Sequence, residues 1–261
     1  MNLSRLQELF QSRELLYFLT WRDVKIRYKQ TLLGATWAVL QPLITMVVFT
    51  VFFGRLANIP TGGMPGPIFY YLALLPWTFF AAGITNAGNS LITNTDLLTK
   101  VYFPRAILPA STILAGLVDL AIASALMGVL LPWYGVTPDL EAFAWPLAIL
   151  VLIILTLGAG MLIAAVNVMY RDVKYALPFV VQLLLFVSPV IYPTEKIPDG
   201  YRWLMLINPL SGIIETSRSA IVPGRAIDWQ HFGISALIAC VVFFVGSTYF
   251  YRVQRRFADL V

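Results

Sequence analysis

Long stretches of apolar residues, almost free of charge, recur along this sequence of 261 residues. A helix rises about 1.5 Å per residue, so a run of about 20 residues is long enough to cross a bilayer. Six runs of about this length cover residues 34–55, 68–89, 106–131, 143–168, 176–194 and 229–251. They are apolar throughout, whereas the strands of a membrane β-barrel alternate apolar and polar residues. The sequence therefore predicts an all-α polytopic membrane protein, with six transmembrane helices in one membrane domain.

The distribution of charge predicts the orientation. Only 12% of the residues are charged, about half of the roughly 25% that is usual in soluble domains. With six crossings, thirteen Lys and Arg residues lie on the side of the two termini and five on the other side. Cytoplasmic segments carry such an excess, so we expect both termini in the cytoplasm. The net charge of +5 comes from basic residues beside the spans, which favours contact with lipid headgroups over binding of nucleic acid.

Residues 1–30 precede the first span and are predicted to form an amphipathic helix in the membrane interface. Asp23 lies one helical turn before Arg27, so the two side chains are spaced to pair. Apolar and basic side chains recur with the helical period on two different faces, namely Tyr17, Trp21, Val24 and Tyr28 against Arg22, Lys25 and Lys29.

Residues 195–228 separate the last two predicted spans and contain Pro198, Pro209 and Pro223. The pieces between these prolines are too short to cross a bilayer, so we expect short or re-entrant helices at the outer surface. Residues 252–261 form a basic tail.

Signs of catalysis or of bound cofactors are lacking. The phosphate-binding motif GxxxxGK[ST] does not occur, and His231 and Cys240 are the only residues of their types. A single cysteine excludes an intrachain disulfide and a cysteine-based metal cluster. The acids are scattered, whereas an active site gathers acids, His or Cys. We therefore expect a chain that is not an enzyme and that holds no cofactor and no metal.

Asp119 lies inside the third span. A carboxylate within a membrane span is costly and is a functional candidate, as a proton relay or a pore-lining group. The alternative is that Asp119 accepts a hydrogen bond from a Ser, Thr or Asn of a neighbouring span, or lies nearer an interface than the predicted boundaries indicate.

Two inner segments carry polar residues that suit either a docking surface for a cytoplasmic partner or a solvated loop. They follow the second and fourth spans and contain Asn94, Asp96, Leu97 and Lys100, and Tyr170, Arg171 and Asp172.

Aromatic residues make up 14% of the chain and allow two interpretations as well, interfacial belts or a passage in which rings stack on sugars. The candidates for stacking are Tyr28, Trp37, Tyr70, Tyr71, Trp77, Phe79, Phe80 and Tyr192. Gly158, Gly160 and Ala164 form a small-residue face that predicts close helix packing.

Several motifs in a fixed order resemble one known family. They are RYKQTLLGATWAVLQP (27–42), LLPWTFF (74–80), NxLITN (89–94), KVYFPR (100–105), NVMYRDV (167–173), SPVIYP (188–193) and NPL (208–210). Together they resemble the membrane subunit of polysaccharide-exporting ABC transporters. This is the ABC-2 permease family of O-antigen, teichoic acid and capsule exporters, with the type V exporter fold. The NVxYRDV motif is more similar to the O-antigen and teichoic acid branch.

The resemblance implies a bacterial inner-membrane channel subunit that exports a lipid-linked polysaccharide. It implies a homodimer that binds two copies of a separate ATPase, which would hold the ATP and Mg. The N-terminal helix would be the interface helix, and Thr31, Leu33 and Gly34 would form a cytoplasmic gate. The 91–104 loop and the 170–172 turn would contact the ATPase, and residues 195–225 would form periplasmic gate helices. The alternatives are another cargo, such as a drug or a lipid, or a proton-coupled carrier centred on Asp119.

Overall fold

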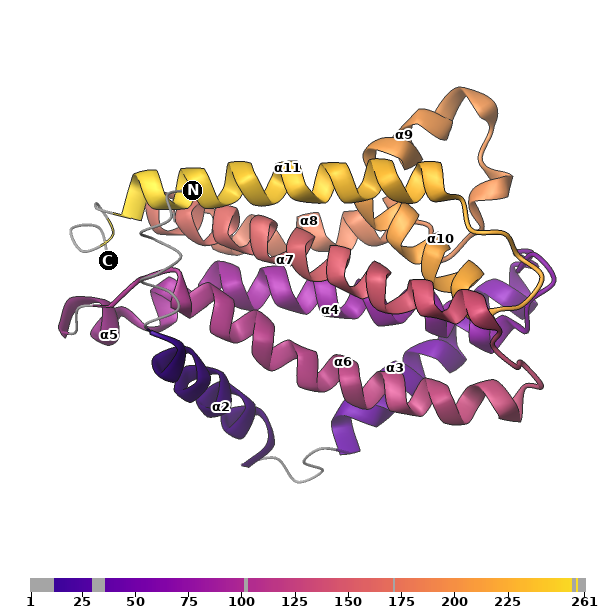
Figure 1. Ribbon diagram of the computed structural model, residues 1–261, viewed down its shortest axis with the longest axis horizontal. Coiled ribbons are helices and arrows are strands. Elements are labelled where there is room, and N and C mark those ends of the chain that lie inside the picture. The colour runs from indigo at the N-terminus through magenta and orange to yellow at the C-terminus, as the bar shows by residue number, and fades with distance from the viewer. Residues whose placement is uncertain (1–11, 30–35, 101–102, 171, 255–256, 258–261) are drawn as a thin grey trace.

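The computed structural model describes residues 12–29, 36–100, 103–170, 172–254 and 257, and every regular element in these ranges is a helix. The longer helices lie side by side in one bundle (Figure 1). In chain order the helices up to the fourth long one are α2 (Arg13–Lys29), α3 (Thr36–Phe49) with its π-helical continuation η1 (Thr50–Leu56), α4 (Gly66–Thr93), α5 (Thr95–Lys100), α6 (Ile107–Trp133), η2 (Leu140–Phe143) and α7 (Ala144–Met169). The remainder are α8 (Val173–Val187), η3 (Thr194–Lys196), η4 (Asp199–Tyr201), α9 (Arg202–Ile207), α10 (Pro209–Ile221) and α11 (Trp229–Val253).

Five of these elements are long and apolar enough to cross a membrane, within the part of the chain that the structure describes. They are α3 with η1, α4, α6, η2 with α7, and α11. They correspond to the first four predicted spans and to the last one. A run of apolar residues predicts such a helix well because every backbone polar group in hydrocarbon must bond within its own segment.

The fifth predicted span, over 176–194, differs from the structure. The helix at this position, α8, has 15 residues and ends at Val187, so it spans only about 22 Å. Ser188 precedes Pro189 and has an extended backbone with ψ 148°, as the proline ring requires of the residue before it. The apolar run continues past this point, but the helix does not.

The centre of the bundle is α4, which packs against both α6 and α7, while α7 packs along α11. The close packing predicted for the small residues of α7 is confirmed, but Gly158 and Gly160 face different helices and do not form a single face. A Cβ atom added at Gly158 would lie 2.3 Å from the Cα of Phe243, and one added at Gly246 would lie 2.1 Å from the carbonyl oxygen of Gly158. Gly160 faces α4, where its added Cβ would lie 2.8 Å from the Cβ of Ala87.

At one end of the bundle, α2 shares an apolar cluster with α5, the start of α6 and the last turns of α4, α7 and α11. We call this the α5 end. Leu19 and Val24 are the buried residues of α2, whereas Tyr17 and Trp21 are 71% and 49% exposed. Most of the predicted aromatic face is therefore exposed, and Val24 is its one buried residue.

The ion pairs of α2 also differ from the prediction. Asp23 pairs with its neighbour Arg22 at 2.9 Å and accepts a hydrogen bond from Ser111 of α6 at 3.4 Å. Arg27 pairs with Asp119 of α6 instead of with Asp23. Asp23 and Arg27 thus bind residues of α6, and they do not form an ion pair with each other across one helical turn.

Residues 195–228 form the short helices that their prolines predict, at the opposite end, which we call the α9 end. In Figure 1, α9 stands out from the bundle while α10 lies within it. Most of α10 is buried against α4, α7 and α11. Its Arg218 is fully buried and hydrogen-bonds to the carbonyl oxygens of Phe69 and Val190 at 3.3 and 3.1 Å.

Candidate functional site

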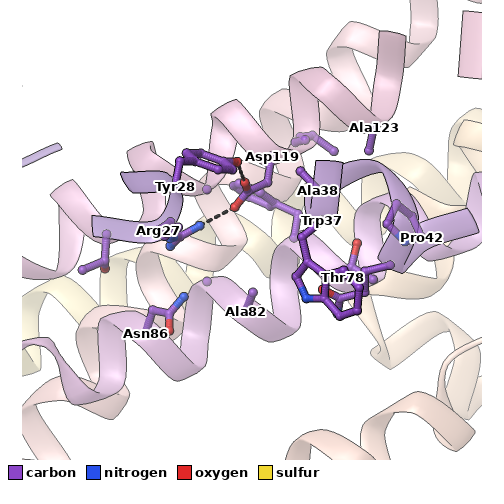
Figure 2. Close-up of a pocket in the computed structure, with 16 residues that line it drawn as sticks. Arg27, Tyr28, Trp37, Ala38, Pro42, Thr78, Ala82, Asn86, Asp119 and Ala123 are labelled. Atoms are coloured by element: carbon purple, nitrogen blue, oxygen red, sulfur yellow. Dashed lines mark hydrogen bonds and ion pairs between the residues drawn. The ribbon is translucent and has the colours of Figure 1, made fainter. Parts of the chain in front are cut away.

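A cavity of about 340 Å³ lies where α2, α3, α4 and α6 meet. Figure 2 shows the side chains around it, with Arg27 and Tyr28 pointing at Asp119. Besides these three, its walls include polar side chains from three helices, Gln41 of α3, Thr78 and Asn86 of α4 and Thr112 of α6. Much of the remaining wall is apolar or small, and includes Trp37, Ala38, Pro42, Phe79, Ala82, Gly83, Gly116, Leu120 and Ala123.

The acid that the sequence places inside a span lies at the midpoint of α6, between Ile107 and Trp133. One oxygen of Asp119 accepts a hydrogen bond from the guanidinium of Arg27, and the other accepts one from the hydroxyl of Tyr28. The Asp119 side chain is 39% exposed, because it faces the cavity. The first part of the alternative was therefore wrong, because the donors are Arg27 and Tyr28 of α2 and not a Ser, Thr or Asn.

The opposite charges of Arg27 and Asp119 cancel in this cluster. The ion pair therefore leaves no net charge in the middle of the bundle. Burial raises the pKa of the Tyr28 hydroxyl above its usual value, and the hydrogen bond to Asp119 and its negative charge raise it further. Tyr28 therefore stays protonated and serves as a donor. Among the described residues that line the cavity, Asp119 is the only acid, so the structure places no second carboxyl beside it for a proton relay.

Seven of the eight aromatic candidates divide into two groups. Tyr28, Trp37 and Phe79 line the cavity, and Trp37 is 51% exposed. Four others lie in the packed interior: Tyr70 and Tyr71 have 0% exposure, and Trp77 and Phe80 have 6% each. Tyr71 is held there by a hydrogen bond from its hydroxyl to the carbonyl of Ala123 at 2.7 Å. Their low exposure gives no support for stacking on sugars at these four positions, and Phe79 is also buried, at 5% exposure, although it lines the cavity.

The eighth candidate, Tyr192, lies in the segment after α8 and not at the cavity. Its hydroxyl donates to the carbonyl of Phe186 at 2.9 Å, which ties this segment back to the last turn of α8.

Sequence reasoning missed the polar wall of α4 and α6, although a signal was present. Thr78, Ala82 and Asn86 are four residues apart, and Thr112, Gly116, Asp119 and Ala123 recur every three or four residues. Small and polar residues at helical spacing inside apolar runs mark the faces that meet at the cavity.

The predicted docking residues gather at the α5 end. Asp96 and Lys100 of α5 are exposed and form an ion pair at 2.9 Å. Asn94 ends α4 and donates to the carbonyl of Ser90 at 2.8 Å, and Leu97 packs against the apolar cluster. Tyr170 and Asp172, between α7 and α8, are both exposed. Arg171 and the predicted gate residues Thr31, Leu33 and Gly34 lie outside the described residues.

A second cavity, of about 320 Å³, lies at the α9 end beside α10 and includes Glu195, Glu215, Asp228 and His231. Each of these acids is engaged: Glu195 pairs with Arg225, Glu215 with Arg218 at 2.8 Å, and Asp228 accepts the backbone N–H of His231 at 2.9 Å. No group of three or more His, Cys, Asp or Glu side chains that could hold a metal occurs within the described residues.

Comparison with known proteins agrees with this architecture. The family model described as ABC-2 type transporter matches residues 14–222. An O-antigen export system permease protein RfbA from Myxococcus xanthus is 31% identical over 259 residues, 98% of each chain. The RfbA protein of Klebsiella pneumoniae is 27% identical and covers 95% of each chain. The polysialic acid transport protein KpsM of Escherichia coli is 26% identical over 86% of this chain and 88% of its own. The expected resemblance is thereby confirmed, and the chain belongs to the ABC-2 type transporter family.

Proposed function

We propose that this chain is the channel subunit of an ATP-driven exporter that moves a lipid-linked, O-antigen-like polysaccharide across the bacterial inner membrane. The observation that carries the proposal is the similarity to the O-antigen export permease of Myxococcus xanthus over 98% of both chains. The similarity to KpsM covers less of each chain, which favours an O-antigen-like cargo over a capsule-like one.

The chemistry of such a cargo calls for a protein passage. Each sugar hydroxyl that loses its water without a new partner costs on the order of a few kcal/mol, so a long glycan has no route through hydrocarbon. A passage with weak contacts at many points lets the chain bind and still move. The walls of the cavity, with Trp37, Gln41 and Asn86, offer contacts of this weak aromatic and amide kind.

The exporter would contain two copies of this chain and two copies of a separate ATPase that binds the ATP and Mg. The sequence has no phosphate loop of its own. Helix α3 is almost wholly unburied within the single chain, and the apolar side chains of α8 are largely exposed. These two helices supply an apolar surface for a second copy and for lipid. The α5 end would face the cytoplasm, with both termini on that side, in agreement with its excess of basic residues.

The docking surface for the ATPase would combine α5 with the turn between α7 and α8. We expect Asp172→Lys to lower nucleotide-dependent export at least about tenfold while the protein still inserts, because reversing a charge at a docking site replaces attraction by repulsion. The measurements are surface polysaccharide in cells and co-purification of the ATPase. Asp199→Lys, the same change at an exposed position of the α9 end, is the matched control. Unchanged export and unchanged co-purification in Asp172→Lys would contradict the docking role.

The cargo is tested with the purified complex of this chain and its ATPase in lipid nanodiscs. We expect a polyprenyl-diphosphate-linked glycan to stimulate ATP hydrolysis several-fold, on the order of the usual coupling between two sites. An amphiphilic drug and the free polyprenyl diphosphate serve as controls and should not stimulate it. Stimulation by the drug, with no response to the glycan, would replace the polysaccharide by a small amphiphilic cargo.

A further inference from the structure

Asp119 is satisfied entirely from another helix. Its two hydrogen bonds come from adjacent residues of α2, Arg27 and Tyr28, which lie in the last turn of that helix. Within the described residues, no hydrogen bond to Asp119 comes from α3, α4 or α6, although all three helices line the same cavity. We call this cluster the Asp119 contact. It fixes the C-terminal end of α2 against the middle of α6, across the cavity (Figure 2).

The Asp119 contact is not sealed inside the protein. The side chains of Arg27 and Asp119 are 27% and 39% exposed, unlike Arg218, whose side chain has no exposure. A fully buried ion pair is costly to break, whereas a partly exposed one is weak and reversible. The rest of α2 is anchored nearer the α5 end, by Leu19 and Val24 and by the hydrogen bond between Asp23 and Ser111. The end of α2 at the cavity is therefore the end whose attachment is easiest to open.

We propose that Asp119 is a positioning residue that holds α2 over the cavity, and that the Asp119 contact opens and closes during the transport cycle. This inference rests on the proposed function and deepens it. Arg27 and Tyr28 act as hydrogen-bond donors to a carboxylate that only accepts. When they leave, the carboxylate in the middle of the span needs other donors. Water or the hydroxyl groups of a glycan supply such donors. The position of α2 therefore depends on whether the cavity holds water or a glycan that can replace Arg27 and Tyr28.

The test uses a cysteine placed in the cavity. Thr112 lines it, and Cys240 is the one native cysteine, so Thr112→Cys is made in a Cys240→Ala background. The rate at which a charged, water-soluble thiol reagent labels this cysteine is measured in membranes that contain the chain and its ATPase. We expect Asp119→Asn and Arg27→Gln each to raise the rate about fivefold or more, a usual size for such coupling. A non-hydrolysable ATP analogue should raise the rate in the parent chain but not in Asp119→Asn.

Two controls separate this role from general loosening. Lys29→Gln removes the same charge from the same helical turn at an exposed position and should leave the rate unchanged. The double variant Arg27→Gln/Asp119→Asn should label no faster than either single one, because the two residues act through one contact. Gel filtration of each variant checks that it is folded.

Unchanged labelling in the folded single variants would overturn the positioning role, and a parent chain that does not respond to nucleotide would overturn the movement. Because the assay contains no glycan, its outcome does not depend on the cargo. If labelling behaves as expected while the nanodisc complex ignores the lipid-linked glycan, only the proposed cargo is wrong.

Discussion

Arg218→Met should prevent most of the protein from accumulating in a folded form. The Arg218 side chain is fully buried in α10, stacks on the ring of Phe69 at 3.6 Å and pairs with Glu215 at 2.8 Å. It also donates to the carbonyl oxygens of Phe69 and Val190. These contacts join α10 to the start of α4 and to the segment after α8. Removing the cation leaves Glu215 and two carbonyl groups without their donor, a change that costs about 3–5 kcal/mol for a buried ion pair.

The measurements are the yield of monodisperse protein and the midpoint of thermal unfolding in detergent. Arg218→Lys keeps the charge but loses the planar set of donors that reaches three acceptors, so we expect a smaller but clear loss of stability. Arg202→Met is the matched control, since Arg202 lies in the same outer segment and pairs with Asp199 at 3.0 Å with both side chains exposed. Such a surface pair contributes less than about 1 kcal/mol. Equal stability of the Arg218→Met and Arg202→Met proteins would contradict the role of Arg218 as an anchor.

The second large effect is expected at the crossing of α7 and α11. In Gly246→Ala the new methyl group would lie 2.1 Å from the carbonyl oxygen of Gly158. Backbone atoms cannot turn aside as a flexible side chain can, so the two helices must separate. Forcing extra volume into a packed interior costs about 1–3 kcal/mol, and more where the backbone itself must shift. We expect a lower midpoint of thermal unfolding and a lower yield.

The same helix offers a control for this change. Gly233 also lies in α11, and an added Cβ there meets nothing within 4 Å. Gly233→Ala should therefore leave stability unchanged or slightly raise it, since alanine favours a helix over glycine by about 1 kcal/mol. Gly158→Ala, which places its methyl group 2.3 Å from the Cα of Phe243, should behave like Gly246→Ala. A Gly246→Ala protein as stable as Gly233→Ala would show that the helices are not held at this distance.

The spans of the bundle followed from the sequence to within a few residues in most cases. The predicted run 143–168 became α7 (Ala144–Met169), and the run 229–251 became α11 (Trp229–Val253). The exception is the run 176–194, in which the helix ends at Val187, because hydropathy alone does not register how Pro189 restricts Ser188 before it. Close helix packing at Gly158 was predicted correctly, because small residues inside an apolar helix let a neighbouring backbone approach.

The candidate site was predicted only in part. Asp119, Tyr28, Trp37 and Phe79 were named from the sequence and meet at one cavity. Tyr70 and Tyr71 were named for the same reason, but α4 is covered by α3, α6, α7 and α10 along its length, and both rings face these neighbours. From residue 68 to 77 every residue of α4 is apolar or aromatic, so the pattern in this part of the helix carries no information about which side is open.

By itself, the sequence determined that the chain crosses a membrane in apolar helices, where most of them begin and end, and to which family it is similar. These properties are local, since the length of each apolar run decides whether it can cross the hydrocarbon, and its backbone hydrogen bonds form within the run itself. Only the tertiary structure decided that Asp119 pairs with a residue 92 positions away, and that Arg218 reaches a carbonyl 149 positions away. The physical reason is that a costly charge inside the helix bundle is satisfied by whichever partner the packing of helices brings to it. That choice depends on helix crossings that no single segment encodes.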